Sequence, residues 1–224
     1  MKNTVAGVDY RFTDSQLLLE ALTHKSAGSV NNERLEFLGD SVLSLVITGR
    51  LFELRPDARE GDLSRMRARL VRGVTLADLA LGLGLGKHIR LGEGELKSGG
   101  FRRASILADT LEALLGAIYL DGGYAQCQRV ITELFDPLID KLPSCEELKD
   151  AKTRLQEWLQ ARARPLPVYT LKSEAGADHA KTFYVCCELS DDGTTVEASG
   201  NGRRKAEQAA AARLLQILQE GQGS

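Results

Sequence analysis

The sequence predicts an all-α domain followed by a small α+β domain with the element order α-β-β-β-α. Apolar residues recur at helical spacing through most of residues 1–142, and strand-like segments follow in the tail. Between them, a proline and a charged run interrupt the periodic pattern. We therefore expect a first domain over 1–142, a linker over 143–150 and a second domain over 151–220.

The composition is that of a globular protein, with 43% hydrophobic and 27% charged residues, which excludes wholesale disorder. No apolar run is long enough to span a membrane, and residues 1–9 lack the apolar core of a signal peptide. A cytoplasmic protein without membrane contact is expected. The four cysteines show no metal-ligand spacing, and we interpret them as structural or incidental surface residues.

The first helix is predicted over residues 14–27, with Asp14 as a possible cap. His24 is expected to be an ordinary structural residue with a satisfied hydrogen bond. The next helix begins after Asn31 or Asn32, either of which can cap it, and ends before Pro56.

Three acids lie near the start of that second helix. Glu33, Glu36 and Asp40 are spaced i, i+3 and i+7, which places them on one face. Apolar residues cover nearly all the rest of the helix, which is typical of a buried helix. Acids on a buried helix must be paired or hold a cation. The alternative to a cation site is that these acids lie in solvent or form salt bridges with neighbours such as Arg34.

A second apolar helix, over residues 105–120, carries Asp109 and Glu112 at i, i+3. If the two acidic faces pack together, their carboxylates repel one another unless a divalent cation joins them. Oxygen ligands suit Mg²⁺ or Mn²⁺. Neither acidic helix face contains cysteine or histidine, so a zinc site is not expected.

The segments between these helices supply further charges. Glu60 lies in an acidic connector before an arginine-rich helix, and a surface acid is its simpler interpretation. After an apolar helix over 74–85, the glycine-rich basic segment 92–103 is predicted to be a loop, either a phosphate contact beside the metal site or a plain surface loop. A last helix is predicted over 124–142, kinked or divided at Pro137.

The tail changes character. Asp191-Asp192-Gly193 signals a hairpin. Residues 151–219 carry a net charge of +2 against −3 for 1–150, and Arg203, Arg204 and Lys205 open the last helix, where free N–H groups favour phosphate. We predict a helix over 153–162, strands over 168–174, 182–189 and 194–198, and a helix over 205–218.

Three strings resemble the bacterial ribonuclease III family: ERLEFLGDSVL at 33–43, GDLSRMRARLV at 61–71 and LKSGGFRRASILADTLEALLGA at 96–117. The tail resembles a double-stranded RNA-binding domain, a module that reads duplex shape across two minor grooves. The resemblance covers nearly the whole chain. It implies an all-α nuclease domain followed by an α+β RNA-binding domain.

The resemblance also implies an activity. Members of the family are endoribonucleases that hydrolyse double-stranded RNA to 5′-phosphate and 3′-hydroxyl ends with short 3′ overhangs, in rRNA processing and mRNA turnover. Mg²⁺ is the expected cofactor, with Mn²⁺ as a substitute. Asp40 and Glu112 are expected to be the catalytic residues that are most costly to lose, and Glu60 a supporting acid. The expected metal ligands are Glu36, Asp40, Asp109 and Glu112.

The family suggests partners for other residues. It implies a homodimer in which Phe37 inserts into the partner subunit, and it places Glu33 toward the dimer and substrate side, outside the metal shell. Gly202 departs from the Ser or Lys that is frequent there in the family, which implies at most one lost phosphate contact. The expected contacts with double-stranded RNA are Gln156, Glu157, His179, Arg203, Arg204 and Lys205.

Two other functions fit parts of the sequence. One is a regulator that binds duplex RNA without cutting it, although the chain has an acid at every position of the family's site. The other is a metal phosphohydrolase acting on small molecules, which gives the RNA-binding tail no purpose. Removing residues 151–224 distinguishes the latter from a nuclease.

Overall fold

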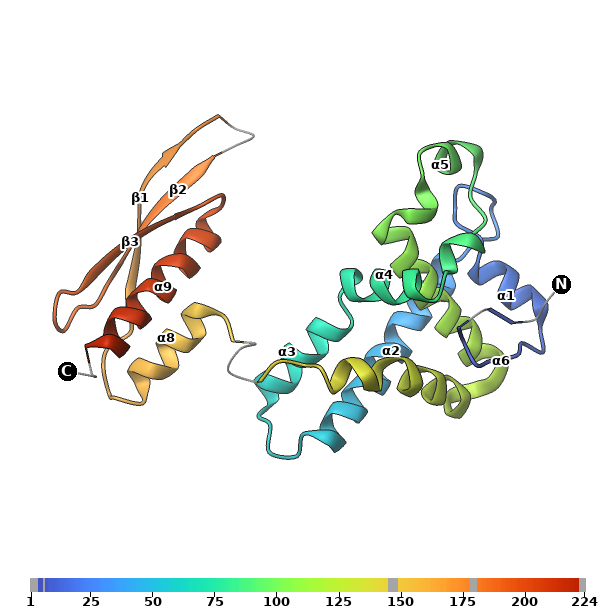
Figure 1. Cartoon of the computed structure of the whole chain (residues 1–224), viewed down its shortest axis with the longest axis horizontal. Helices are drawn as coiled ribbons and strands as arrows, with labels where there is room; N and C mark the ends of the chain where they lie inside the picture. Colours follow the sequence, from blue (N-terminus) through green and yellow to red (C-terminus); the bar gives the residue numbers. More distant parts are fainter. Residues whose placement is uncertain (1–3, 6, 145–148, 178–180, 222–224) are drawn as a thin grey trace. The chain divides into compact units, whose positions relative to one another are not determined.

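The computed structural model describes residues 4–5, 7–144, 149–177 and 181–221. The chain forms two compact units, Met1–Leu142 and Pro143–Ser224. The first is helical and the second combines helices with a sheet, as the sequence predicts (Figure 1). Within the described ranges, we find no helix with the length and apolar character needed to cross a membrane.

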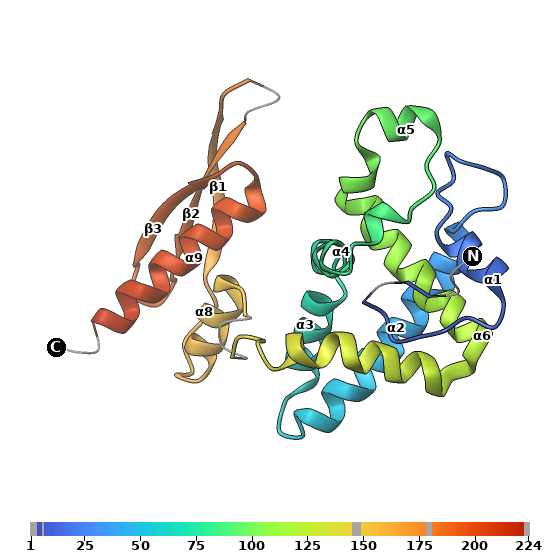
Figure 2. The same ribbon diagram turned by 45° about the vertical axis from the view of Figure 1, so that its right-hand side comes forward.

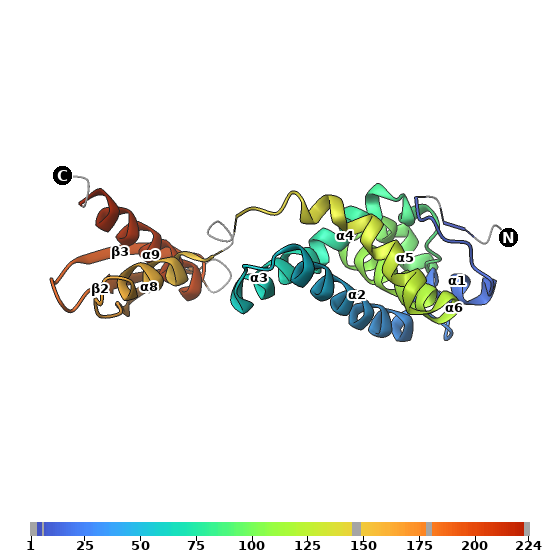
Figure 3. The ribbon, with the colours of Figure 1, turned by 90° about the horizontal axis from the view of Figure 1, so that it is seen from below.

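The first unit is built on two long helices, α2 and α6. Figure 3 shows them side by side, and they form the most extensive helix–helix contact of the unit. The elements of this unit are α1 Ser15–Ala21, α2 Glu33–Leu54, α3 Glu60–Leu70, α4 Gly73–Gly82, the 3₁₀ turn η1 Leu85–Lys87, α5 Glu93–Lys97, the 3₁₀ turn η2 Gly100–Arg102 and α6 Ala104–Ile139.

Two glycines bring α2 and α6 into backbone contact. A Cβ atom at Gly39 would lie 1.8 Å from the carbonyl oxygen of Glu112, and one at Gly116 would lie 2.2 Å from that of Leu35. Such distances leave no room for any side chain. The helices are therefore closest at Gly39 and Gly116, and buried apolar residues of both helices surround this contact.

The long helix α6 changes direction at Gly123, whose φ of 76° and ψ of 178° are not helical. A positive φ favours glycine, so the break falls where the sequence permits it. Pro137 lies inside the helical run, which continues to Ile139. Pro137 therefore does not divide the last helix, and the break at Gly123 falls between the helices predicted over 105–120 and 124–142.

The start of α2 uses both predicted asparagines, in different ways. Asn31 Oδ1 accepts a hydrogen bond from the Glu33 N–H at 3.1 Å. Asn32 occupies the cap position but its side chain makes no capping bond, and it is 2% exposed. The expected burial of α2 on nearly all sides is wrong, since Phe37, Leu45 and other large apolar side chains on it face solvent.

The predicted limits of two other segments also change. Asp14 caps α1 as expected, with its side chain accepting from the Gln16 N–H at 2.8 Å, but the helix ends at Ala21 rather than at residue 27. The basic segment 92–103 is not wholly a loop, because it contains α5 and η2. Gly99, with φ 76°, makes the turn between them.

The second unit is a three-stranded antiparallel sheet of order β1-β2-β3 with both helices packed against one another (Figure 2). α9 covers β2 and β3. Its core joins Leu155 and Leu159 of α8, Cys187 of β2 and Leu214 of α9. The elements are α8 Ala151–Gln160, β1 Val168–Ala175, β2 Thr182–Glu188, β3 Thr195–Gly200 and α9 Arg203–Glu220.

The predicted hairpin turn between β2 and β3 is confirmed. Gly193 has a φ of 70°, and Asp192 accepts a hydrogen bond from the Thr194 N–H at 2.9 Å. The Arg164 guanidinium bonds Asp191 through Nε at 2.7 Å, and it also bonds Asp192. The hydrogen bonds from Thr194 and Arg164 lower the pKa of Asp192 to about 2. Arg164 thus joins the α8–β1 connection to the turn.

Three of the four cysteines are described, and all three are free thiols with buried side chains: Cys127, Cys186 and Cys187. Cys127 donates to the Leu115 carbonyl oxygen at 3.3 Å. The expected structural role fits this burial, whereas Cys145 lies outside the described residues.

Candidate active site

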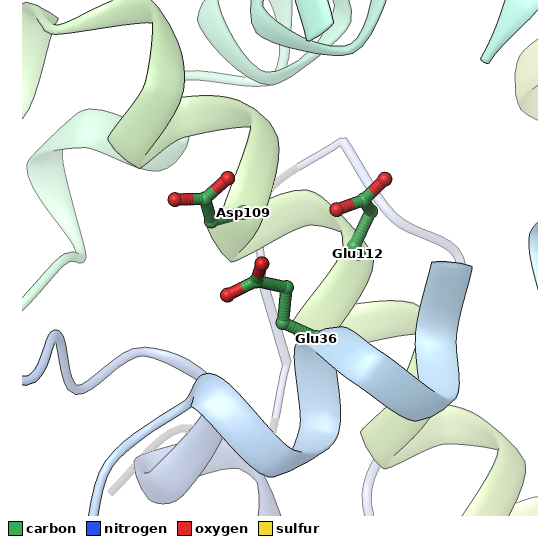
Figure 4. A group of neighbouring side chains, drawn as sticks. All are labelled: Glu36, Asp109 and Glu112. Carbon is green, nitrogen blue, oxygen red and sulfur yellow. The ribbon is translucent and has the colours of Figure 1, made fainter. Parts of the chain in front are cut away.

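Three carboxylates meet where α2 and α6 cross. Glu36 of α2 faces Asp109 and Glu112 of α6 (Figure 4). One carboxylate oxygen of each lies within 4.8 Å of the others, and all three side chains are half-buried. We call Glu36, Asp109 and Glu112 the carboxylate group.

The glycine contact explains why these side chains meet. Gly39 lies one turn after Glu36, and its Cα faces the carbonyl of Glu112. Residues three apart on a helix share a face, so Asp109 and Glu112 point the same way from α6. The close approach of the backbones then leaves the acids of the two helices within reach of one another.

Burial and mutual repulsion make the carboxylate group hold protons more tightly than free acids. Burial, and then the charges of Asp40, Glu36 and Asp109, raise the pKa of Glu112 to about 7. Burial likewise raises the pKa of Glu36 and of Asp109. Half-buried carboxylates with no cation among them are unfavourable when ionised, so a divalent cation fits this site. The all-oxygen donors are those of hard cations, and the group contains no histidine or cysteine.

Asp40 lies close to the carboxylate group without belonging to it. It follows Glu36 by one turn on α2, and its side chain is exposed. Its negative charge raises the pKa of Glu112, so it lies near the same site. The structure therefore brings three of the four predicted metal ligands together and leaves Asp40 at the edge.

Glu60 is not brought into the carboxylate group. It begins α3, where its Oε1 accepts a hydrogen bond from Ser64 Oγ at 2.8 Å. It lines a pocket of about 460 Å³ near the end of α2, together with Phe52 and Leu63. Within one chain, the predicted supporting acid thus belongs to a different surface.

Sequence reasoning missed a basic residue beside the acids. Lys25, in the connection after α1, places Nζ 3.1 Å from Glu33 Oε1. Its charge lowers the pKa of both Glu36 and Asp109, against the larger effect of burial. His24 has the expected hydrogen-bond partner, with Nδ1 2.8 Å from Ser26 Oγ. Nothing in the local spacing shows that this connection approaches α2.

The predicted RNA contacts in the second unit lie around the start of α9. Arg203, Arg204 and Gln156 line an open hollow of about 600 Å³ between α8 and α9. Lys205 follows Arg204 in the first turn of α9 and is exposed, and Glu157 of α8 binds Lys149. The cap residue of α9 is Gly202, which has no side chain that could accept from the first N–H groups of the helix. These groups therefore stay open to an anion. His179 lies outside the described residues.

Phe37 is 79% exposed, with its ring in solvent immediately next to Glu36. Leu45 is 60% exposed and Phe52 is 72% exposed on the same helix. A run of large apolar side chains along one helix face indicates a surface that another molecule covers.

Two family models match the chain. One, described as Ribonuclease-III-like, matches residues 14–138. The other, described as Double-stranded RNA binding motif, matches residues 151–218. The two matched segments coincide with the helical unit that carries the carboxylate group and with the α+β unit.

Known proteins resemble the chain over nearly its whole length. Ribonuclease 3 of Alkalilimnicola ehrlichii is 54% identical over 211 residues, which are 94% of this chain and 92% of that protein. Ribonuclease 3 of Vibrio cholerae is 49% identical over 221 residues, which are 99% of this chain and 98% of that protein. Among solved structures, a nuclease domain of Ribonuclease III from Campylobacter jejuni has a TM-score of 0.56 and 46% identity, covering 57% of this chain and 90% of that one.

Proposed function

This chain belongs to the ribonuclease III family and is an endoribonuclease specific for double-stranded RNA, and from that premise we propose that it cuts RNA at the carboxylate group with Mg²⁺ as cofactor. The observation that supports this site is the meeting of Glu36, Asp109 and Glu112 across the α2–α6 contact. Mn²⁺ has the same preference for oxygen ligands and substitutes for Mg²⁺. The products we expect carry 5′-phosphate and 3′-hydroxyl ends with short 3′ overhangs.

The carboxylate group, with Asp40 beside it, would hold the cation. When bound, Mg²⁺ supplies Lewis-acid activation of water and of the phosphate. The protein residues supply the rest. Glu112 is half-buried and its pKa is raised to about 7, whereas Asp40 is exposed beside it. Asp40 and Glu112 are the side chains whose loss we expect to cost most.

A cleavage assay on a long perfect RNA duplex, in Mg²⁺ and then in EDTA, tests this proposal. Cutting that needs the metal and the duplex agrees with it. Tight binding of the duplex without cutting in Mg²⁺ would instead favour a non-cleaving RNA-binding regulator. In the cell, we propose that the enzyme acts in the cytoplasm on ribosomal and messenger RNA precursors.

We also propose that the protein acts as a homodimer. The Campylobacter jejuni structure is described as having a region involved in dimer formation in its nuclease domain. In this chain, Phe37 and Phe52 are nearly equidistant along α2 from Leu45, and all three are exposed. A two-fold axis near Leu45 would place Phe37 of one subunit at the pocket beside Phe52 in the other.

This arrangement gives Glu60 a role. Glu60 lines the pocket beside Phe52, and Phe37 adjoins Glu36 in the chain. Inserting Phe37 into the partner's pocket would therefore bring Glu60 of one subunit toward the carboxylate group of the other. An acid remote from the site within one chain would then support the site across the interface.

Phe37→Glu is expected to separate the dimer, because it places a charge in the apolar contact. We expect the dissociation constant to rise at least 100-fold, which corresponds to about 2.7 kcal/mol, as measured by analytical ultracentrifugation. Leu81→Glu is the matched control, since Leu81 is 62% exposed on α4, away from the α2 face. Unchanged dimerisation of Phe37→Glu would contradict the interface.

The tail is proposed to bind the duplex through Gln156, Glu157, His179, Arg203, Arg204 and Lys205, within a domain spanning 151–220. The linker is proposed to span 143–150 and the nuclease domain 1–142. These proposals follow from the family match to residues 151–218 and from the basic start of α9.

Removing residues 151–224 is expected to weaken duplex RNA binding and to make the slope of log affinity against log salt shallower, because phosphate contacts are lost. Measuring cleavage of a duplex from 50 to 200 mM salt tests this. The full chain should cut more of the duplex at the upper end than the shortened one, because its tighter binding keeps the RNA bound. Equal salt dependence of the two proteins would show that the tail contributes no phosphate contacts.

A further inference from the structure

The connection after α1 is fixed against the segment before α5. The His24 N–H donates to the Arg90 carbonyl oxygen at 3.0 Å, and the Arg90 N–H donates to that of Leu22 at 2.7 Å. The Gly92 N–H donates to Ser26 Oγ at 2.9 Å. A Cβ at Gly92 would lie 2.2 Å from the Ser26 carbonyl oxygen, so the two segments are in backbone contact.

The same connection is tied to the helix that carries Glu36. The Asn32 N–H donates to the Thr23 carbonyl oxygen at 2.9 Å, and the Asn32 carbonyl oxygen accepts from the Glu36 N–H at 2.8 Å. Thr23 and Asn32 are both buried. Lys25 therefore follows a backbone that is held in place relative to the carboxylate group.

The Lys25 side chain, by contrast, is held only by an exposed ion pair among the contacts described. Lys25 is 63% exposed and its partner Glu33 is 53% exposed, with Nζ 3.1 Å from Oε1. Exposed pairs of this kind contribute little to folding stability. Lys25 can therefore exchange Glu33 for another anion at small cost, while its main chain stays where it is.

A cation beside the carboxylate group would offset the repulsion between its acids and the RNA backbone. A phosphodiester that approaches Glu36 and Asp109 meets their repulsion, and the charge of Lys25 acts on both of these acids. We propose that Lys25 binds a phosphate oxygen of the RNA next to the cleaved bond, and that Glu33 holds the ammonium in position until the RNA arrives. This inference rests on the proposed cleavage site, and it gives Glu33 a role outside the metal shell.

The test compares Lys25→Gln with Lys25→Arg and with Lys141→Gln, a matched loss of charge from an exposed lysine that lines a different groove, after α6. Duplex binding is measured at several salt concentrations with Glu112→Gln added to each protein, so that cutting does not interfere. Single-turnover cleavage at saturating RNA is measured without that change. Melting temperatures show whether each variant is folded.

Loss of one phosphate contact should reduce the slope of log affinity against log salt by about one. We expect that reduction for Lys25→Gln, together with a cleavage rate lower by roughly tenfold, which corresponds to about 1.4 kcal/mol. Lys25→Arg should keep the slope, and Lys141→Gln should keep both slope and rate. Glu33→Gln should bind RNA as tightly as the native protein or tighter, because the competing anion is gone.

An unchanged slope and rate in Lys25→Gln would overturn the proposal, and so would an equal loss in Lys141→Gln. Binding weakened by Glu33→Gln as much as by Lys25→Gln would contradict the exchange of Glu33 for a phosphate oxygen, because removal of a competing anion cannot weaken binding. If the native chain and Lys141→Gln fail to cut, the proposed function fails instead. The salt slopes then still decide whether Lys25 contacts phosphate.

Discussion

Glu112→Gln is expected to abolish cleavage of duplex RNA while leaving folding, dimerisation and RNA binding intact. The amide has the shape of the carboxylic acid but cannot supply an anionic oxygen to a cation. We expect the single-turnover rate in Mg²⁺ to fall by at least about 1,000-fold, which corresponds to roughly 4 kcal/mol of the activation barrier. Glu133→Gln is the matched control on the same helix, where Glu133 is exposed and binds Arg129.

The same substitution should stabilise the metal-free protein at alkaline pH. The pKa of Glu112 is raised from its ordinary value of 4.5 to about 7 in the folded chain, so the folded state holds this proton more tightly than the unfolded state. The resulting stability is fully present below pH 4.5 and is lost as the pH rises through about 7. Melting in EDTA at pH 8 should therefore occur at a higher temperature for Glu112→Gln than for the native chain, and the difference should vanish in acid. Normal turnover by the variant in Mg²⁺ would contradict the role of Glu112.

Gly39→Ala is expected to be the most destabilising small substitution in the nuclease unit. The added Cβ would lie 1.8 Å from the Glu112 carbonyl oxygen and 2.6 Å from its carbon. These are backbone atoms of α6, so the helices must separate. Overpacking of a core costs about 1–3 kcal/mol or more, and we expect at least about 3 kcal/mol here. That corresponds to a fall in melting temperature on the order of 10 °C for a chain of this size.

Separation of the helices should also remove activity, because it draws Glu36 away from Asp109 and Glu112. Gly82→Ala is the control in the same unit, since Gly82 is the last residue of α4, outside the α2 face proposed for the dimer, and a Cβ there meets no atom within 4 Å. It should melt and cut like the native protein. Gly39→Ala that melts and cuts like the native protein would show that the two backbones do not approach as described.

The acidic pairs were predictable because helix geometry is local. Spacing of i, i+3 places Asp109 and Glu112 on one face wherever the helix lies. Apolar residues on both acidic helices then predict that these faces meet, and the structure confirms it for Glu36 with the α6 pair. The α-β-β-β-α order of the tail was likewise predictable from strand alternation and the Asp192-Gly193 turn.

Other features depend on which surfaces pack. Nothing local distinguishes the covered side of α2 from the side that bears Phe37 and Leu45, because apolar residues occur on both. Gly39 lies on the covered side, where its lack of a side chain lets α2 approach the backbone of α6. The prediction of a helix buried nearly all round failed for this reason.

The sequence by itself therefore determined the elements, their order and the acids that share a helix face, because these depend on neighbours three or four residues away. The tertiary structure alone decided that Asp40 stands at the edge, that Glu60 belongs to another surface and that Lys25 lies beside the acids. Those placements depend on backbone contacts at Gly39 and Gly92, each with a carbonyl far away in the chain. Such contacts arise from packing, which no local spacing encodes.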